Sequence, residues 1–140
     1  DLRAVSLALV DADEALIEAS KIKPPQLFVW SALRALDFAP EPRVVLGALQ
    51  TLGQPMWNPP SPEGFSDESA TWLAPYAITS RLDLAQQVAP AANARYSPAE
   101  YVDLILGPDV SDDTRTEILQ AESRSQAIAL LLMSPEFQRT

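Results

Sequence analysis

Proline occurs thirteen times in this chain of 140 residues, and its placement constrains the fold more than any other feature. Pro25, Pro42 and Pro98 each precede apolar residues spaced three or four apart. Proline at the first position of a helix leaves no hydrogen bond unmade, because that N–H has no partner in the helix. These prolines therefore predict helix starts. No segment alternates apolar and polar residues over the length of a strand, so the chain is predicted to be all-α.

The apolar spacing gives the approximate extent of each helix. Stripes fall within residues 2–10, 25–36, 42–52 and 78–89. Capping residues mark further starts: Ser97 with Glu100, Ser111 or Asp112, Ser123 with Gln126, and Ser134 before a final turn containing Phe137. Asp11 and Glu14 have the spacing of a capping box for another helix over 11–20. The expected fold is an irregular bundle of six to eight short helices.

The composition is that of one globular domain, so we treat residues 1–140 as a single helical domain. Hydrophobic residues make up 47% of the chain and charged residues 21%. The longest apolar run, 127–133, is far shorter than the roughly 18 residues of a membrane helix. We therefore expect no membrane insertion. Residues 1–10 mix acidic and basic groups and show no signal-peptide pattern.

The net charge of −9 opposes binding to nucleic acid, since that affinity comes largely from lysine and arginine on phosphates. The chain has no cysteine and no histidine, which excludes disulfides, thiolate or imidazole zinc sites and histidine-based triads. Asp109, Asp112 and Asp113 do not have the spacing of a calcium loop and are better explained as helix caps. We predict no metal site and no cofactor.

Residues 53–75 interrupt the helical pattern with five prolines and three large aromatics. Loops of this length inside a domain are uncommon and are often functional. The prolines reduce the entropy lost on ordering, so the loop is expected to be ordered. Its aromatics either fill the core, which is their more common use, or form a binding surface for a saccharide or a peptide. The residues proposed for such a ligand site are Trp57, Asn58, Glu63, Phe65, Trp72, Tyr76 and Arg81.

Arg34 and Arg81 each stand in a strongly apolar helical segment. An arginine there commonly extends to solvent or pairs with a carboxylate that fixes helix packing. The alternative is that it clamps a ligand. Asp37 and Asp83 are the nearby acids, but Asp83 lies on another face of its helix from Arg81.

A paired-carboxylate hydrolase site is the catalytic alternative in the loop. Glu63 with Asp67 or Glu68 is the one pair that lies among the aromatics. Glycoside cleavage needs two carboxyl groups about 5 to 9.5 Å apart, one of them with a raised pKa. The sequence contains the groups but specifies neither condition, so it assigns no catalytic residue. A solvated acidic loop explains the same residues.

Several segments together resemble the C-terminal region of the bacterial domain-of-unknown-function 1800 family. They are KIKPPQLFVWSALRAL at 21–36, LGQPMWNPPSPEGF at 52–65, TWLAPYAITSRLDLA at 71–85 and LLLMSPEFQ at 130–138. The chain departs from the family pattern at Phe65, where tryptophan is typical, and at Asp83, where asparagine is common.

The resemblance implies a C-terminal part of a larger bacterial protein that is exported, in the periplasm or outside the cell. It supplies no reaction and no catalytic residue. The leading hypothesis is therefore a helical domain that packs on the N-terminal part of the same protein and completes it. The alternatives are a saccharide- or peptide-binding module that uses residues 53–76, and one part of a hydrolase whose site lies partly in that N-terminal region.

Overall fold

The computed structural model describes residues 1–13 and 21–139, and within them the fold is all-α, as predicted. Seven of its helices have eight or more residues and two are single turns of four residues. The helices are α1 (Leu2–Val10), α2 (Pro25–Ala35), α3 (Pro42–Thr51), α4 (Ser69–Trp72), α5 (Pro75–Val88), α6 (Pro98–Ile105), α7 (Asp112–Leu119), α8 (Arg124–Met133) and α9 (Pro135–Gln138), with a 3₁₀ turn, η2 (Ala89–Ala91). The helix expected over 11–20 falls mostly outside the described residues.

Proline and side-chain caps start the helices where the sequence indicates. Proline occupies the first turn of α2, α3, α5, α6 and α9. Ser97 and Glu100 form the full capping box of α6. Ser111 caps α7 by accepting from the Thr114 N–H. At α8 the cap is only partial: Ser123 accepts from the Gln126 N–H, whereas the Gln126 side chain bonds the Glu122 N–H.

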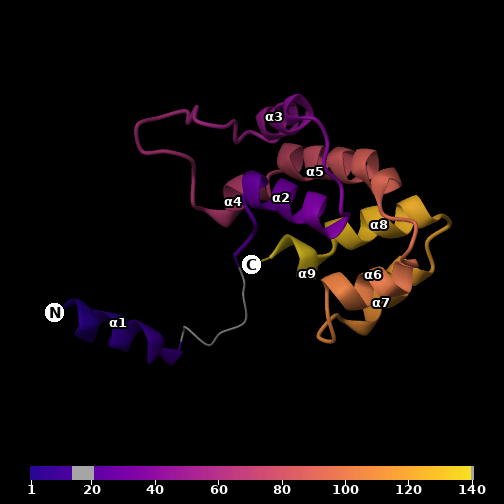
Figure 1. Ribbon diagram of the computed structural model, residues 1–140. Coiled ribbons are helices and arrows are strands. Elements are labelled where there is room, and N and C mark those ends of the chain that lie inside the picture. Colours follow the sequence, from indigo (N-terminus) through magenta and orange to yellow (C-terminus); the bar gives the residue numbers. More distant parts are fainter. Residues whose placement is uncertain (14–20, 140) are drawn as a thin grey trace.

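The core is arranged around α8, which packs against α5, α6, α7, α9 and η2. Ile128, Leu131 and Leu132 of this helix are fully buried. Its position near the centre of the bundle is visible in Figure 1, with α5 and α2 on one side and α6 and α7 on the other. The hydrophobic side chains of α8 are thus shared by most of the other helices, which is why a set of short helices can form one core.

Two expectations about the segment 53–89 need correction. The loop is not irregular throughout, because residues 69–72 form α4 and Pro75 begins α5. The buried face of α5 also differs in part from the predicted apolar stripe Ile78, Leu82, Ala85 and Ala89: Ala85 and Ala89 are buried as expected, but Leu82 is exposed, and Arg81 and Val88 are buried on the inner side.

Loop 53–68 leaves the end of α3, extends away from the bundle and returns at α4 (Figure 1). It starts at Gly53, whose φ of +83° favours glycine, and turns again at Gly64 with a φ of +96°. Gln54 ties the start of the loop to α2, since its Oε1 accepts from the Gln26 N–H at 2.8 Å. The loop is thus anchored at both ends to the bundle.

Helices α7 and α9 are joined by a hydrogen-bonded carboxylate. Glu136 accepts from the Ser111 N–H at 3.2 Å, from the Ser111 hydroxyl at 2.9 Å and from the Thr114 hydroxyl at 3.1 Å. Partial burial of the carboxylate raises the pKa of Glu136, but a hydrogen bond from its own backbone N–H and those from Ser111 and Thr114 outweigh it and hold the pKa below the ordinary value of 4.5.

Replacing Glu136 with glutamine should lower the free energy of unfolding by about 1 kcal/mol at pH 7, since charge-assisted hydrogen bonds that are partly exposed to water contribute less than buried ones. A pKa lowered in the folded state stabilises the fold above the unfolded pKa, and this contribution is lost as the pH falls through the folded value. Urea unfolding should therefore show a difference in unfolding free energy between wild type and E136Q at pH 7. This difference should disappear in acid, below pH 4.5. The exposed Glu122, changed to glutamine, serves as the control, and a difference that persists in acid would contradict the assignment.

Candidate functional site

Helix α2 presents apolar side chains on two sides. Phe28, Val29 and Leu33 face the core and are buried. On the opposite side Leu27, Trp30, Ser31 and Arg34 follow the spacing i, i+3, i+4 and i+7, so they form one strip on the surface. We call this strip the α2 face. Trp30 remains 45% exposed on it, although it stands in a strongly apolar helix.

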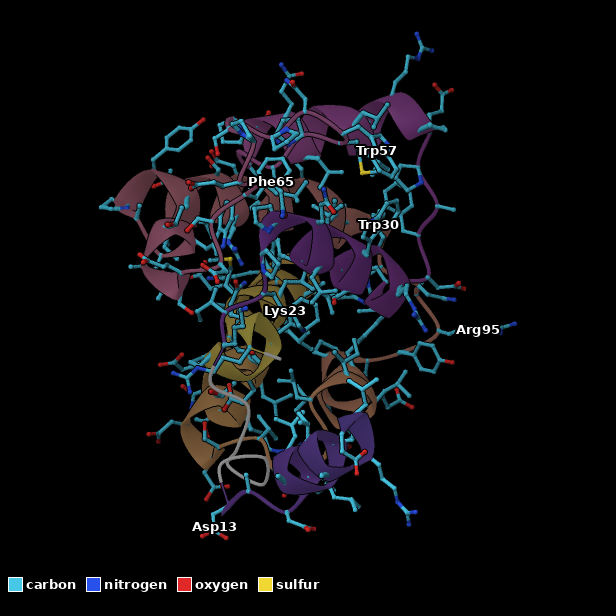
Figure 2. The ribbon with its side chains drawn as sticks, turned by 90° about the vertical axis from the view of Figure 1, so that its left-hand side faces the viewer. Asp13, Lys23, Trp30, Trp57, Phe65 and Arg95 are labelled. Carbon is cyan, nitrogen blue, oxygen red and sulfur yellow. The ribbon has the colours of Figure 1, made fainter. Side chains whose placement is uncertain are left out.

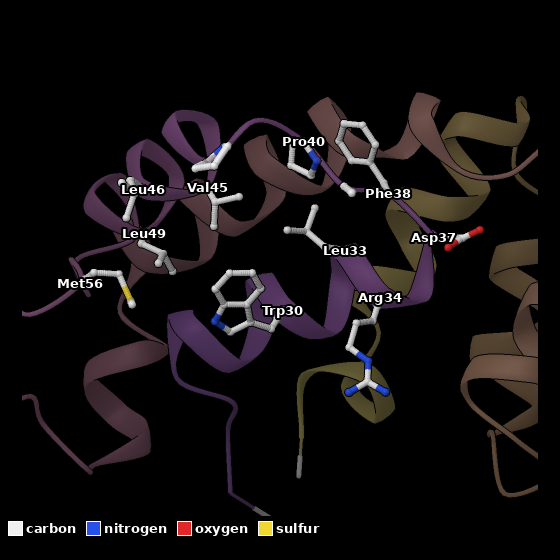
Figure 3. A pocket seen from close by; sticks show the side chains of 12 residues that line it. Trp30, Leu33, Arg34, Asp37, Phe38, Pro40, Val45, Leu46, Leu49 and Met56 are labelled. Atoms are coloured by element: carbon white, nitrogen blue, oxygen red, sulfur yellow. The ribbon is translucent and has the colours of Figure 1, made fainter.

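A groove of about 670 Å³ opens between α2 and α3 beside Trp30. Trp30 and Leu33 of α2 face Val45, Leu46 and Leu49 of α3 across it (Figure 3). Its lining residues are Trp30, Leu33, Arg34, Asp37, Phe38, Ala39, Pro40, Pro42, Val45, Leu46, Leu49 and Met56. Only Arg34 and Asp37 among these carry charge, so the α2–α3 groove is a continuous, largely apolar surface.

A second pocket of about 520 Å³ lies on the other side of the α2 face, against α6 and α9. It shares Trp30 and Arg34 with the groove and adds the ammonium group of Lys23 and the carboxylate of Glu136. Glu136 is already bonded to α7, whereas the Arg34 guanidinium makes no hydrogen bond or ion pair within the described part of the chain. This α2–α9 pocket is thus locally basic in a strongly acidic protein.

Lys23 is fixed at the edge of this pocket. Its Nζ donates to the Phe137 carbonyl at 2.6 Å and lies 4.3 Å from the centre of the Phe137 ring. Burial lowers the pKa of Lys23, because desolvation disfavours the charged amine.

The aromatic side chains of the loop do not come together. Trp72 is buried on α4, where its indole N–H donates to the Ser66 carbonyl at 3.2 Å. Phe65 is half-buried, while Tyr76 is exposed with its hydroxyl 3.4 Å from the Thr51 carbonyl. Trp57 and Phe65 lie at separate points in Figure 2. None of the pockets described here is lined by any of these four side chains.

Trp57 itself has an unusual conformation. Its side chain is 91% exposed and its φ is +57°, in the left-handed region that bulky residues rarely adopt. Of the other proposed ligand residues in the loop, Asn58, the next residue, and Glu63, six residues further on, are also exposed. Trp57 therefore has no packing role inside the chain that would explain its strained backbone.

The structure gives no sign that the acidic residues of the loop form a catalytic site. Glu63, Asp67 and Glu68 are all exposed on the loop, and none of the described pockets contains them. In the part of the chain that the structure describes, no cluster of three or more acidic side chains is arranged to hold a metal ion. The same described part has no helix with both the length and the apolar character to cross a bilayer.

Arg81 is completely buried, so it does not extend to solvent, and it pairs with no carboxylate of the described residues. Its NH1 donates to Gln138 Oε1 at 2.6 Å and its NH2 to the Lys23 carbonyl at 2.7 Å. The guanidinium lies over the Phe28 ring, 5.0 Å from its centre. Its Nε has no hydrogen-bond partner within the described structure. Arg81 is therefore a packing residue that joins α5, α9 and the segment before α2.

The partners of Arg81 are themselves held in place. Gln138 Nε2 donates to the Leu132 carbonyl at 2.7 Å, which orients its Oε1 toward the guanidinium. Lys23 N donates to the Gln138 carbonyl at 2.8 Å, beside an isolated antiparallel bridge between Ile22 and Arg139. Burial lowers the pKa of Arg81 to about 10, which still leaves it charged at neutral pH.

Sequence reasoning missed the α2 face and the partners of Arg81. The first had a signal: Leu27, Trp30 and Arg34 repeat at helical spacing beside the buried stripe of Val29 and Leu33, so α2 is apolar on two sides. The partners of Arg81 had none, because Gln138 lies far away in the chain and no local pattern connects the two.

The fold and this open face define an all-helical domain with an apolar groove beside one of its helices. Residues 1–139 match the family described as a protein of unknown function (DUF1800), and the chain belongs to that family. No curated protein and no solved structure matches the chain.

The packing role of Arg81 can be tested by substituting it and its partner Gln138. Gln138→Leu should lower the free energy of unfolding by about 2–3 kcal/mol, since it removes a hydrogen bond to a buried charge. Arg81→Met should cost about 2 kcal/mol, because it leaves the Lys23 carbonyl and the Gln138 side chain without their donor. The double variant should lose about 1–2 kcal/mol less than the sum of the two, as expected for side chains in contact.

Urea unfolding followed by circular dichroism measures all three variants. Gln87 is exposed on the same helix α5, and Gln87→Leu is the matched control, expected within about 0.5 kcal/mol of wild type. Strictly additive losses for Arg81 and Gln138 would contradict the coupling.

Proposed function

We propose that this chain is a non-catalytic helical interaction domain that packs through the α2 face and the α2–α3 groove against another part of a larger exported bacterial protein. The observation that carries the proposal is the open apolar groove, with Trp30 45% and Leu46 49% exposed on its two sides. A stably folded domain seldom leaves such a continuous apolar surface in water unless it serves an interface.

The chemistry of the groove supports packing over catalysis. Its charged residues are one arginine and one aspartate, and its floor consists of Leu33, Val45 and Leu49. The chain has neither histidine nor cysteine to act as a base or a nucleophile. The carboxylates of the loop are exposed, which gives no support to the hydrolase alternative.

The role of Trp30 can be tested in the full-length protein. If the α2 face is covered there, Trp30→Ala should lower the free energy of unfolding by about 3–5 kcal/mol, the cost for a fully buried tryptophan. A side chain that stays half exposed should lose about half of that or less. Chemical unfolding of the full-length protein measures the difference, and Trp57→Ala, at the most exposed tryptophan, is the control. Equal, small losses for both variants would contradict the proposal.

A second candidate function uses Trp57 to bind a saccharide or a peptide. Its strained backbone and nearly complete exposure favour this alternative, since an exposed indole can stack on a sugar ring. Titration with cellohexaose, chitohexaose and a proline-rich decapeptide, followed by tryptophan fluorescence, tests it. A saturable change that Trp57→Ala abolishes and Trp30→Ala retains would support binding at the loop. No change with any of the three probes would count against it.

A further inference from the structure

Helix α1 contributes nothing to the core of the bundle. All nine of its residues are exposed, and in the described part of the chain the first buried residue is Ile22. Figure 1 shows α1 standing apart from the other helices. The hydrophobic core described above is therefore built from residues that follow α1 in the chain.

The bundle has a defined beginning at Ile22 and Lys23. Ile22 forms the antiparallel bridge with Arg139, and its N–H donates to the Ser69 hydroxyl oxygen at 3.4 Å. The Lys23 carbonyl accepts from Arg81 at 2.7 Å. These contacts fix the start of the bundle to α4, α5 and the carboxy-terminal segment at once. Helix α1 precedes this anchored point and is structurally separate from the bundle.

The apolar side chains of α1 surround the helix. At 3.6 residues per turn, side chains two positions apart point in nearly opposite directions. Leu7 and Leu9 have this relation and are 53% and 71% exposed. Arg3 and Ser6 are the only polar residues in the sequence of α1. A helix that rests on a surface has one apolar and one polar face, whereas a helix that is apolar all round is enclosed in a core.

We propose that α1 is enclosed on all sides by an apolar helical core in the N-terminal part of the parent protein, so that it joins that part to the bundle. The inference rests on the proposed function, in which the chain belongs to a larger protein, but it concerns a surface separate from the α2–α3 groove. Nine residues form a helix of about 14 Å, which the enclosing core has to match in thickness.

The charges at the two ends of α1 agree with such a position. Asp1 caps the start of the helix, and Asp11 and Asp13 follow its end. Their carboxylates would lie at the edges of an enclosing core, with the apolar middle of the helix inside it. The same carboxylates oppose binding to an anionic lipid surface. A helix of about 14 Å is also too short for the roughly 30 Å hydrocarbon layer of a bilayer.

A second copy of the chain is a less suitable partner. Each copy carries a net charge of −9, so two copies repel each other. Two α1 helices packed together would cover one side of each and leave the opposite side in water. Because Leu7 and Leu9 lie on opposite sides, a single flat contact cannot bury both. Enclosure by several elements at once is the arrangement that does.

Cysteine labelling tests the enclosure, and the absence of cysteine from the 140 residues makes each new thiol a single reporter in the chain. Leu7→Cys and Leu9→Cys are prepared in this chain and in the full-length protein. The reaction of each with N-ethylmaleimide is followed at that residue by mass spectrometry. Both thiols should react rapidly in the 140-residue chain. In the full-length protein both should react about 100-fold more slowly or less, since labelling then requires an opening of the core.

Leu119→Cys is the matched control, because Leu119 is 48% exposed on α7 and lines none of the described pockets. It should react at the same rate in both proteins. Rapid labelling of Leu7→Cys or of Leu9→Cys in the full-length protein would overturn the proposal, since α1 would then have at least one side in water. Protection of both thiols in the 140-residue chain, caused by raising its concentration or by adding phosphatidylglycerol vesicles, would also overturn it.

Amide hydrogen exchange repeats the test without substitution. A nine-residue helix without tertiary contacts is only marginally stable in water, so the amides of α1 should exchange rapidly in the 140-residue chain. In the full-length protein their exchange should be about 100-fold slower or less. Equal exchange rates in the two proteins would contradict the enclosure, even if a cysteine variant failed to fold.

The two proposals can fail separately. If α1 is protected in the full-length protein but Trp30→Ala costs little stability there, α1 is enclosed and the α2 face is not an interface. If Trp30→Ala is strongly destabilising while α1 is labelled rapidly, the α2 face is an interface and the enclosure of α1 is wrong.

Discussion

The buried guanidinium of Arg81 is the interaction on which the arrangement of the bundle depends. No carboxylate of the described residues pairs with it, so its desolvation must be offset by neutral acceptors with good geometry. Gln138 and the Lys23 carbonyl supply them at 2.6 and 2.7 Å, and the Phe28 ring covers the group. Those acceptors come from the last helix and from the segment before α2. Segments far apart in the sequence are therefore fixed relative to α5 by a single side chain.

The position of the α2 face follows from these contacts of Arg81. Phe28 packs edge-on against Phe137 with ring centres 6.1 Å apart, so the inner side of α2 faces α9. Because the inner side of α2 is packed against α9, the side chains on the opposite side of the helix point outward. These are Leu27, Trp30 and Arg34. Helix α3 covers part of α2 but leaves Leu46 and Trp30 partly in water. The open groove is thus a consequence of how α2 is held.

The sequence predicted the elements of the fold well because their signals are local. Pro25, Pro42 and Pro98 begin helices where expected, and Ser134 caps the final turn that contains Phe137. Helix α4 was missed since four residues give no periodicity to detect. The buried face of α5 was misjudged because burial of Arg81 depends on Gln138, a distant acceptor that the sequence around residue 81 does not reveal. The candidate site was missed for a related reason: whether an apolar strip on a helix is inside or outside is decided by its neighbours in space.

The two exposed tryptophans, Trp30 and Trp57, show why exposure alone does not define an interface. Trp57 is the more exposed, yet it is surrounded by a polar, proline-rich loop and lines none of the described pockets. Trp30 is half covered, but the apolar surface continues from it across Leu33, Val45 and Leu49. The free energy of association grows with contiguous apolar area and is concentrated in aromatic side chains that a partner can surround completely. A partner helix laid along α3 would complete the burial of Trp30, whereas Trp57 would need a partner that supplies the entire pocket.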